Sequence, residues 1–155
     1  MIDHLVFVFY IYFFLFSSIG FGIKFSHILN NNLINLNLGW YGIIGFFLIS
    51  FISIFTSFFV AHNYLHNFII HMPGFIFFCS NFFKSKNIKE YKVLFFLSLF
   101  LLIGAYIFKN HDDFSYYHLT YSLNLSENSF IVGTGNFSHG FRTFSSLFYY
   151  HSTLF

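Results

Sequence analysis

Long stretches without a charged residue are the feature that most limits how this chain can fold. The cleanest of them runs for 22 residues, from Trp40 to Ala61, without Asp, Glu, Lys or Arg. A helix rises about 1.5 Å per residue and the hydrocarbon layer of a bilayer is about 30 Å thick, so about 20 apolar residues cross it. Charged residues make up only 8% of the chain, against about 25% in a soluble domain. The sequence therefore predicts an integral membrane protein and excludes a soluble globular domain and a disordered chain.

The apolar stretches predict an all-α protein with about four transmembrane helices, near residues 5–23, 40–61, 64–83 and 92–108. The first is interpreted as a retained helix, because no basic residue precedes it and no small-residue cleavage site follows it. Pro73 removes one backbone hydrogen bond from the third, so we expect a kink near residues 69–73. Small residues share one side of the second and predict close packing by another helix; they are Gly39, Gly42, Ser50, Ser53 and Ser57, with Gly45 at the flank.

Basic residues predict the orientation of these helices. The stretch from Lys84 to Lys92 holds four of the seven cations of the chain, and short loops rich in Lys stay in the cytoplasm. By alternation Lys24 and the loop 30–37 are cytoplasmic, while the N-terminus and everything after Lys109 lie outside. We therefore divide the chain into a transmembrane region, 1–108, and an extracytoplasmic segment, 109–155, in a multi-pass protein of the cell membrane. The bilayer is the expected partner, and a net charge of +2 speaks against nucleic acid.

The segment 109–155 differs in kind from the apolar stretches. It mixes aromatic with polar residues, and about 47 residues with this many aromatics and few charges cannot bury a core alone. Such a composition suits short helices and loops that lie at the membrane interface. Gly133, Gly135 and Gly140 predict a turn-rich loop within it, since glycine disfavours both helix and strand.

An ionisable cluster opens this segment, with Asp112 and Asp113 between His111 and His118. One interpretation is a solvated helix cap, in which the carboxylates accept backbone N–H groups at the positive end of a helix. The other is a catalytic base or a site for a divalent cation, because neighbouring carboxylates raise one another's pKa and Asp and His are metal ligands. The residues alone leave both interpretations open.

Two further sets of residues have alternative interpretations. Arg142, the only arginine, either clamps a phosphate or pairs with lipid headgroups. His62, His66 and His71 have spacings of four and five residues, which suit one metal-binding face. Their neighbours are polar and no carboxylate is near in sequence, which favours histidines at the membrane interface.

The stretch from His111 onward resembles the first conserved outer loop of a family of uncharacterised bacterial polytopic membrane proteins, themselves similar to lipid-carrier-dependent glycosyltransferases of the GT-C type. Three elements carry the resemblance: Asp113-Phe-Ser-Tyr116-Tyr117-His118, Gly133-Thr-Gly135-Asn136, and Ser145-Ser146-Leu-Phe148. The resemblance implies a membrane enzyme that transfers a sugar from a polyprenyl phosphate. It implies Asp113 first and Asp112 second as the base or metal ligand, His118 beside them, and His111 and Arg142 as substrate contacts.

The chain also departs from typical members of the glycosyltransferase group. Its acidic loop follows the fourth span rather than the first, and such enzymes use many more helices. Residues 147–155 lack Lys and Arg and read as the start of another apolar segment. We therefore expect an N-terminal fragment that is inactive by itself. The alternative is a non-enzymatic membrane protein, either a transporter fragment or a small subunit that packs through the small-residue side of the second span.

Overall fold

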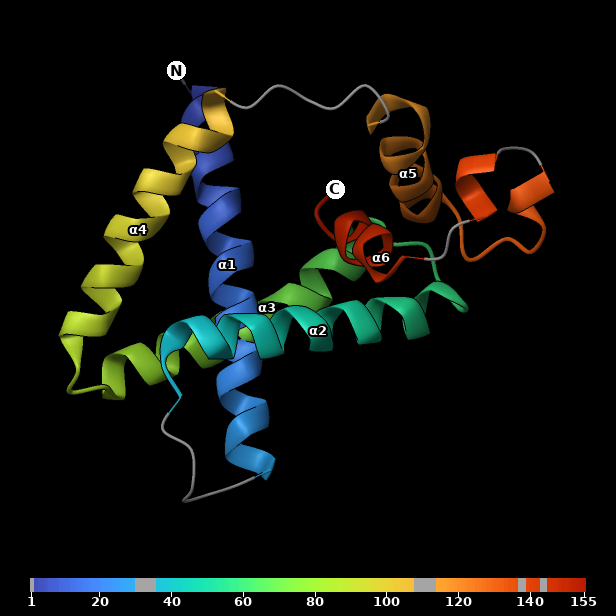
Figure 1. The fold of residues 1–155 in the computed structure, drawn as a ribbon. Coiled ribbons are helices and arrows are strands. Elements are labelled where there is room, and N and C mark those ends of the chain that lie inside the picture. Colours follow the sequence, from blue (N-terminus) through green and yellow to red (C-terminus); the bar gives the residue numbers. More distant parts are fainter. Residues whose placement is uncertain (1, 30–35, 108–113, 137–138, 143–144) are drawn as a thin grey trace. The chain divides into compact units, whose positions relative to one another are not determined.

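The computed structural model describes residues 2–29, 36–107, 114–136, 139–142 and 145–155. Within these ranges the chain is helical and has no β-strand, which confirms the all-α prediction for the described part (Figure 1). The long helices are α1 (Ile2–Leu29), α2 (Leu38–Ser57), α3 (Tyr64–Lys84) and α4 (Ile88–Ile107). Shorter ones follow: the π-helix η1 (Phe114–His118), α5 (Leu119–Glu127), the 3-10 helices η2 (Thr134–Asn136) and η3 (His139–Arg142), and α6 (Ser146–Ser152).

Asparagine caps mark where two of the long helices begin. The side-chain oxygen of Asn37 accepts the backbone N–H of Trp40 at 3.0 Å, at the start of α2. Asn63 does the same for the N–H of His66 at 3.0 Å, at the start of α3. Each bond satisfies a donor that the first helical turn leaves without an intrahelical partner. Helix α3 then continues through Pro73 to Lys84.

Helix α2 ends at Ser57, so the prediction that it extends to residue 61 is wrong. The carbonyl of Ser57 accepts the N–H of Phe130 at 2.7 Å, and the N–H of His62 goes to the carbonyl of Leu125 at 2.8 Å. In a continuing helix these two groups would bond within α2 and its extension. Contacts with a segment some 70 residues away thus stop the helix, although residues 58–60 remain as apolar as the helix itself.

Among the described residues, two helices are long and apolar enough to cross a membrane. They are His4–Leu29, within α1, and Leu38–Ser57, which is α2. This length and composition agree with a membrane protein.

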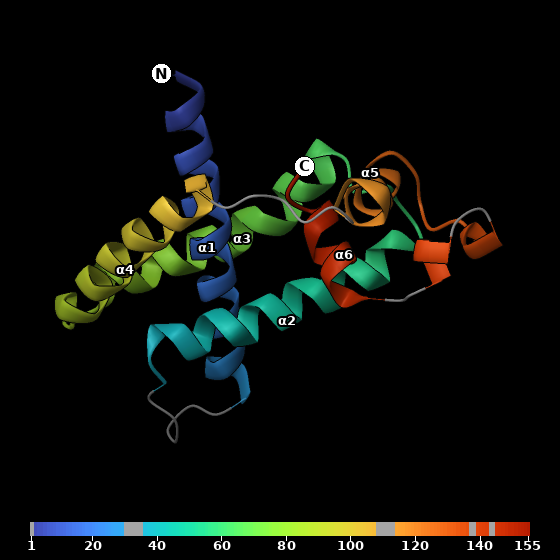
Figure 2. The same ribbon diagram turned by 45° about the horizontal axis from the view of Figure 1, so that its top comes forward.

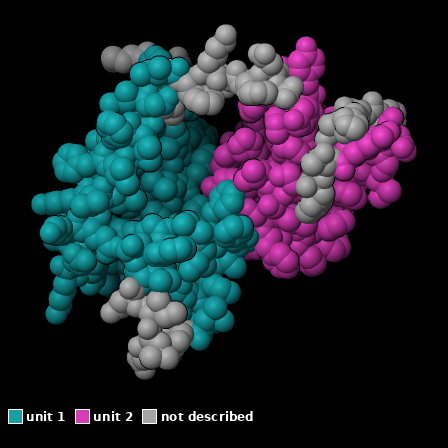
Figure 3. Space-filling view, viewed as in Figure 1, with its two compact units in different colours: residues 1–48, 71–108 teal, residues 49–70, 109–155 magenta. Residues whose placement is uncertain are grey.

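The chain forms two compact units, and the first comprises residues 1–48 and 71–108 (Figure 3). In this unit α1 crosses the parts of α2 and α3 that belong to it, as Figures 1 and 2 both show. A Cβ atom at Gly45 would overlap the carbonyl oxygen of Ser18, and one at Gly20 would overlap that of Gly74. Glycine therefore lets the helix backbones touch. The predicted close packing on the small-residue side of the second helix is confirmed at Gly45.

Polar contacts inside the first unit join its helices. The backbone N–H of Leu38 donates to Glu90 Oε1 at 2.7 Å, which connects the start of α2 to the start of α4. A buried His71 on α3 contacts the hydroxyl of Ser17 on α1, with Nδ1 and Oγ 3.1 Å apart. Apolar side chains pack around these contacts, among them the buried residues Ile19, Ile23, Leu38, Phe78 and Tyr91.

The second unit comprises residues 49–70 and 109–155. Its core contains Tyr121 and Leu125 from α5 and Phe148 and Tyr149 from α6, and Ile54 from α2 packs against them. The expectation that the C-terminal segment cannot bury a core alone agrees with this arrangement, because residues of α2 contribute to the core. Gly133 has a φ of +89° and precedes η2, in agreement with the predicted turn-rich loop.

Candidate functional site

The acidic cluster predicted from the sequence lies outside the described residues. This cluster consists of His111, Asp112 and Asp113. The roles proposed for them as substrate contact, base, metal ligand or helix cap therefore stay predictions. The structure does describe His118 and Arg142, the other two members of the predicted site.

His118 is the last residue of η1 and is half-buried among aromatic rings. Its ring centroid lies 4.2 Å from that of Tyr117 and 5.1 Å from that of Phe148. The imidazole is thus held by ring packing against α6. It also lowers the pKa of His151, after the larger effect of partial burial, because two nearby imidazolium charges would repel each other.

Arg142 lies at the end of η3 with an exposed side chain. Its Nε donates to the carbonyl of Gly135 at 3.0 Å, which joins η3 to η2 and uses one of the five N–H donors of the guanidinium. Helix η3 also contacts η1, the helix of His118. The structure therefore brings the elements that carry His118, Gly135 and Arg142 together in one part of the second unit.

A buried polar network in the same unit was missed by the sequence analysis. Its centre is His62, which is 0% exposed. His62 Nδ1 lies 2.5 Å from Ser152 Oγ on α6, and Nε2 lies 3.3 Å from Thr56 Oγ1 on α2. The side chain therefore connects α2 to the segment 146–155.

His66 and Asn67 extend this network onto α3. The His66 ring stacks on the His62 ring at 4.5 Å, with Nε2 2.9 Å from Thr56 Oγ1 and Nδ1 3.0 Å from Asn67 Oδ1. The amide nitrogen of Asn67 donates to three carbonyl oxygens, those of His62 at 2.8 Å, Ser152 at 3.1 Å and Phe155 at 2.8 Å. One side chain thus holds both the loop before α3 and the chain after α6.

The donors and acceptors of this network can be assigned when both rings are neutral. Because the Asn67 nitrogen donates, its Oδ1 accepts from His66 Nδ1–H, and His66 Nε2 then accepts from the Thr56 hydroxyl. Thr56 has one hydroxyl proton, so His62 Nε2–H donates to Thr56 Oγ1. The remaining nitrogen, His62 Nδ1, then accepts from the Ser152 hydroxyl.

Burial keeps His62 in this neutral form. In the alternative, Ser152 donates to the carbonyl of Tyr149 at 2.7 Å and His62 donates to Ser152 from Nδ1; only donation from both ring nitrogens would give His62 a charge. Desolvation by burial, followed by repulsion from His66, lowers the pKa of His62 from 6.5 to about 4. His62 is therefore uncharged at neutral pH.

This network acts as a structural clamp. A serine beside an imidazole has the composition of an activated nucleophile, but Ser152 and His62 are both 0% exposed and no substrate reaches them. His71, the third histidine of the spacing noted above, bonds to Ser17 within the first unit. The described residues contain no group of three His, Cys, Asp or Glu that could hold a metal ion.

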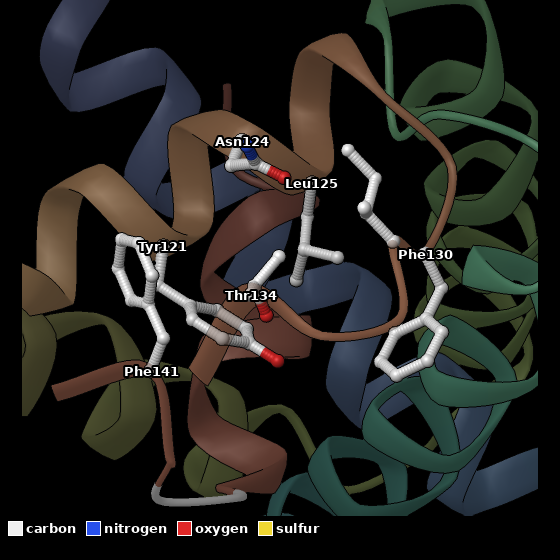
Figure 4. A pocket seen from close by; sticks show the side chains of 7 residues that line it. Tyr121, Asn124, Leu125, Phe130, Thr134 and Phe141 are labelled. Atoms are coloured by element: carbon white, nitrogen blue, oxygen red, sulfur yellow. The ribbon is translucent and has the colours of Figure 1, made fainter. Parts of the chain in front are cut away.

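The second unit also contains a small cavity beside α5 (Figure 4). Its volume is about 10 Å³, which is room for about one water molecule. Side chains that line it include Tyr121, Leu125, Phe130 and Phe141. A cavity of this size does not admit a sugar or a lipid chain.

No family model, no curated protein and no solved structure matches this chain. The resemblance to lipid-carrier-dependent glycosyltransferases therefore rests on the sequence elements quoted above. Of the residues that it implies, His118 and Arg142 lie on helices that touch.

Proposed function

We propose that this chain is a multi-pass protein of the cell membrane whose segment 109–155 lies on the extracytoplasmic face. Support comes from which loops contact each other. In a chain with four alternating spans, the loops 30–37 and 84–92 share one face, while the turn 58–63 and the segment 109–155 share the other. The bond to Glu90 from Leu38, the residue that directly follows the loop 30–37, supports the first pair, and the bond from His62 to Leu125 supports the second.

The crossing of α1 over its neighbours is compatible with four spans. Helices tilt by up to about 40° from the bilayer normal, so two spans that tilt in opposite directions can cross widely. Helices α1 and α2 meet the length and composition of a span. For α3 and α4 a transmembrane position belongs to the proposal.

We further propose that this chain is the N-terminal part of a membrane glycosyltransferase. The enzyme would take its sugar from a polyprenyl phosphate. The observation that carries this proposal is the contact between η1 and η3. Asp113 directly precedes η1 in the sequence, and Arg142 ends η3. The acidic group would accept a proton from the acceptor hydroxyl, and the guanidinium would bind the phosphate of the donor.

A non-enzymatic membrane component is the second candidate, and the sealed network around His62 favours it. The polar groups of this network hydrogen-bond to one another inside the second unit. None of them faces a space large enough for a substrate. In such a component, the small-residue side of α2 is not a contact with another subunit. Ser50, Ser53 and Ser57 are at most 2% exposed and are covered within the chain itself.

Cysteine labelling tests the orientation. In a Cys79→Ser background, Asn87→Cys should react with a membrane-impermeant maleimide only after the membrane is permeabilised. Ser129→Cys, at an exposed position of the C-terminal segment, is the matched variant and should react in intact cells. Labelling of residue 87 in intact cells would overturn the orientation.

Substitution of the acidic residues tests the activity, in a full-length homologue assayed for sugar transfer. General base catalysis contributes about 10²–10⁴-fold, so Asp113→Asn should lower turnover by that order, and Asp112→Asn should lower it less. Asn caps a helix about as well as Asp, so a capping role predicts near-normal transfer by both variants. Near-normal transfer by Asp113→Asn therefore refutes the catalytic assignment of Asp113, whereas no transfer by the unsubstituted protein favours the non-enzymatic candidate.

A further inference from the structure

An apolar groove lies in the first unit, between α3 and α4. Its volume is about 720 Å³, within the range of about 300–1,000 Å³ that is typical of ligand sites. The lining is almost entirely aromatic and aliphatic, and it includes Phe78, Cys79 and Phe82 from α3 and Lys92, Phe95 and Phe96 from α4.

The groove presents a large apolar surface that the described part of the chain does not cover. Phe83 at its edge is 82% exposed and Phe96 is 68% exposed. Contiguous exposed rings of this kind mark a contact with a membrane, a ligand or another protein. An occupant of the groove must therefore present a mainly apolar surface.

One polar feature distinguishes this groove from a plain lipid-facing surface. Lys92 lines it, next to the stretch that also contains Lys84, Lys86 and Lys89. Glu90, the only carboxylate in that stretch, accepts from the backbone N–H of Leu38 and from the side-chain amide of Asn87. Among the described residues no carboxylate neutralises Lys92, so the groove combines a hydrocarbon surface with a positive charge at one end.

We propose that this groove binds an anionic phospholipid of the surrounding bilayer, with an acyl chain between α3 and α4 and the phosphate at Lys92. The ammonium group is a point charge that binds phosphate without a fixed geometry, and clusters of Lys beside a membrane helix attract anionic headgroups. The site lies beside the loop for which we predict a cytoplasmic position. It is therefore distinct from the outer site proposed for the sugar donor. The inference rests on the membrane part of the proposed function and is independent of glycosyl transfer.

Cys79 provides the probe, because it is the single cysteine of the chain and lines the groove. The full chain is labelled at Cys79 with a bimane and placed in bilayers that contain brominated phosphatidylglycerol or brominated phosphatidylcholine at equal mole fraction. Brominated acyl chains quench the fluorophore on contact. Phosphatidylglycerol should bind about fivefold more tightly than phosphatidylcholine, the ratio that corresponds to about 1 kcal/mol for one Lys near an anionic surface.

Two variants with the same change in charge locate the effect. Lys92→Gln should bring the ratio close to one. Lys86→Gln, in the same basic stretch but outside the groove lining, should retain most of it. As a measurement without the label, phosphatidylglycerol that co-purifies with the unlabelled protein should be detected by mass spectrometry and should be reduced in Lys92→Gln.

Several results would overturn the proposal. Equal quenching by the two lipids shows a surface without headgroup selectivity, and no quenching by either shows that protein fills the groove. Equal effects of Lys86→Gln and Lys92→Gln show a diffuse surface charge instead of a site. Alkaline carbonate extraction separates this failure from that of the proposed function. Retention in the membrane with equal quenching refutes only the lipid site, whereas release from the membrane refutes both.

Discussion

Acidification should release the segment 146–155 from the α2–α3 turn, because His62 is buried in its neutral form. The pKa of His62 is about 4 in the folded chain and 6.5 when the side chain is exposed. Between these values the unfolded form binds more protons than the folded form, so the free energy of unfolding falls as the pH falls. The contribution of neutral His62 to the free energy of unfolding is complete above pH 6.5 and is lost as the pH approaches about 4. At 1.36 kcal/mol per pKa unit, the loss is about 3 kcal/mol.

Hydrogen exchange measures this loss directly. Protection factors of the α6 amides, corrected for the intrinsic effect of pH on exchange, should fall on the order of a hundredfold between about pH 7 and about pH 4. His62→Asn removes the titrating group and should show a clearly smaller fall, although its stability at neutral pH is lower. His151 contributes in the same direction, since burial and His118 lower its pKa, so the difference between the two proteins isolates His62.

His27→Asn is the control, at an exposed position near the end of α1. It should retain the full pH dependence of the natural sequence. Equal pH dependence of α6 protection in the natural protein and in His62→Asn would refute the argument, because it would show that His62 titrates alike in both states.

Two further outcomes follow from packing and hydrogen bonding. Gly45→Ala should lower the melting temperature by several degrees, since its Cβ would overlap the carbonyl of Ser18. Gly104→Ala should leave the melting temperature unchanged or raise it, because beyond the backbone of its own helix no atom of the described residues lies within 4 Å of the added Cβ. Equal effects of the two substitutions would contradict the close approach of α1 and α2. Asn67→Leu should expose residues 146–155 to limited proteolysis, because three carbonyl oxygens lose their donor at about 1–3 kcal/mol for each buried group. An unchanged proteolysis pattern would show that these bonds do not hold the segment.

Local sequence signals identified the helices well. Apolar runs located all four long helices, and the predicted start of the third at residue 64 is the observed start of α3. These signals act over one or two turns, so they are visible in a short window of sequence. The glycines of the second span also predicted a close helix contact, which Gly45 makes.

Contacts over long sequence distances were beyond such signals. Residues 58–61 are apolar and read as helix, but a hydrogen bond from Phe130 ends α2 at Ser57. His62 and Asn67 appeared as histidine and asparagine at a membrane edge, and their polarity gave no hint of burial. Their partner on α6, Ser152, lies 90 residues from His62 and 85 residues from Asn67. A single sequence contains no information on which of many serines would satisfy them.

The long separation between His62 and Ser152 has a consequence for how the chain is made. Synthesis proceeds at about 5–20 residues per second, so the 90 residues between the two partners take roughly 5–18 s to appear. During this interval the α2–α3 turn has been translated, but its hydrogen-bonding partners have not. Its polar side chains must meanwhile bond to water, lipid headgroups or the insertion machinery. The second unit is therefore the last part of this chain to mature, and the newly made turn is where quality-control factors would find an unfinished molecule.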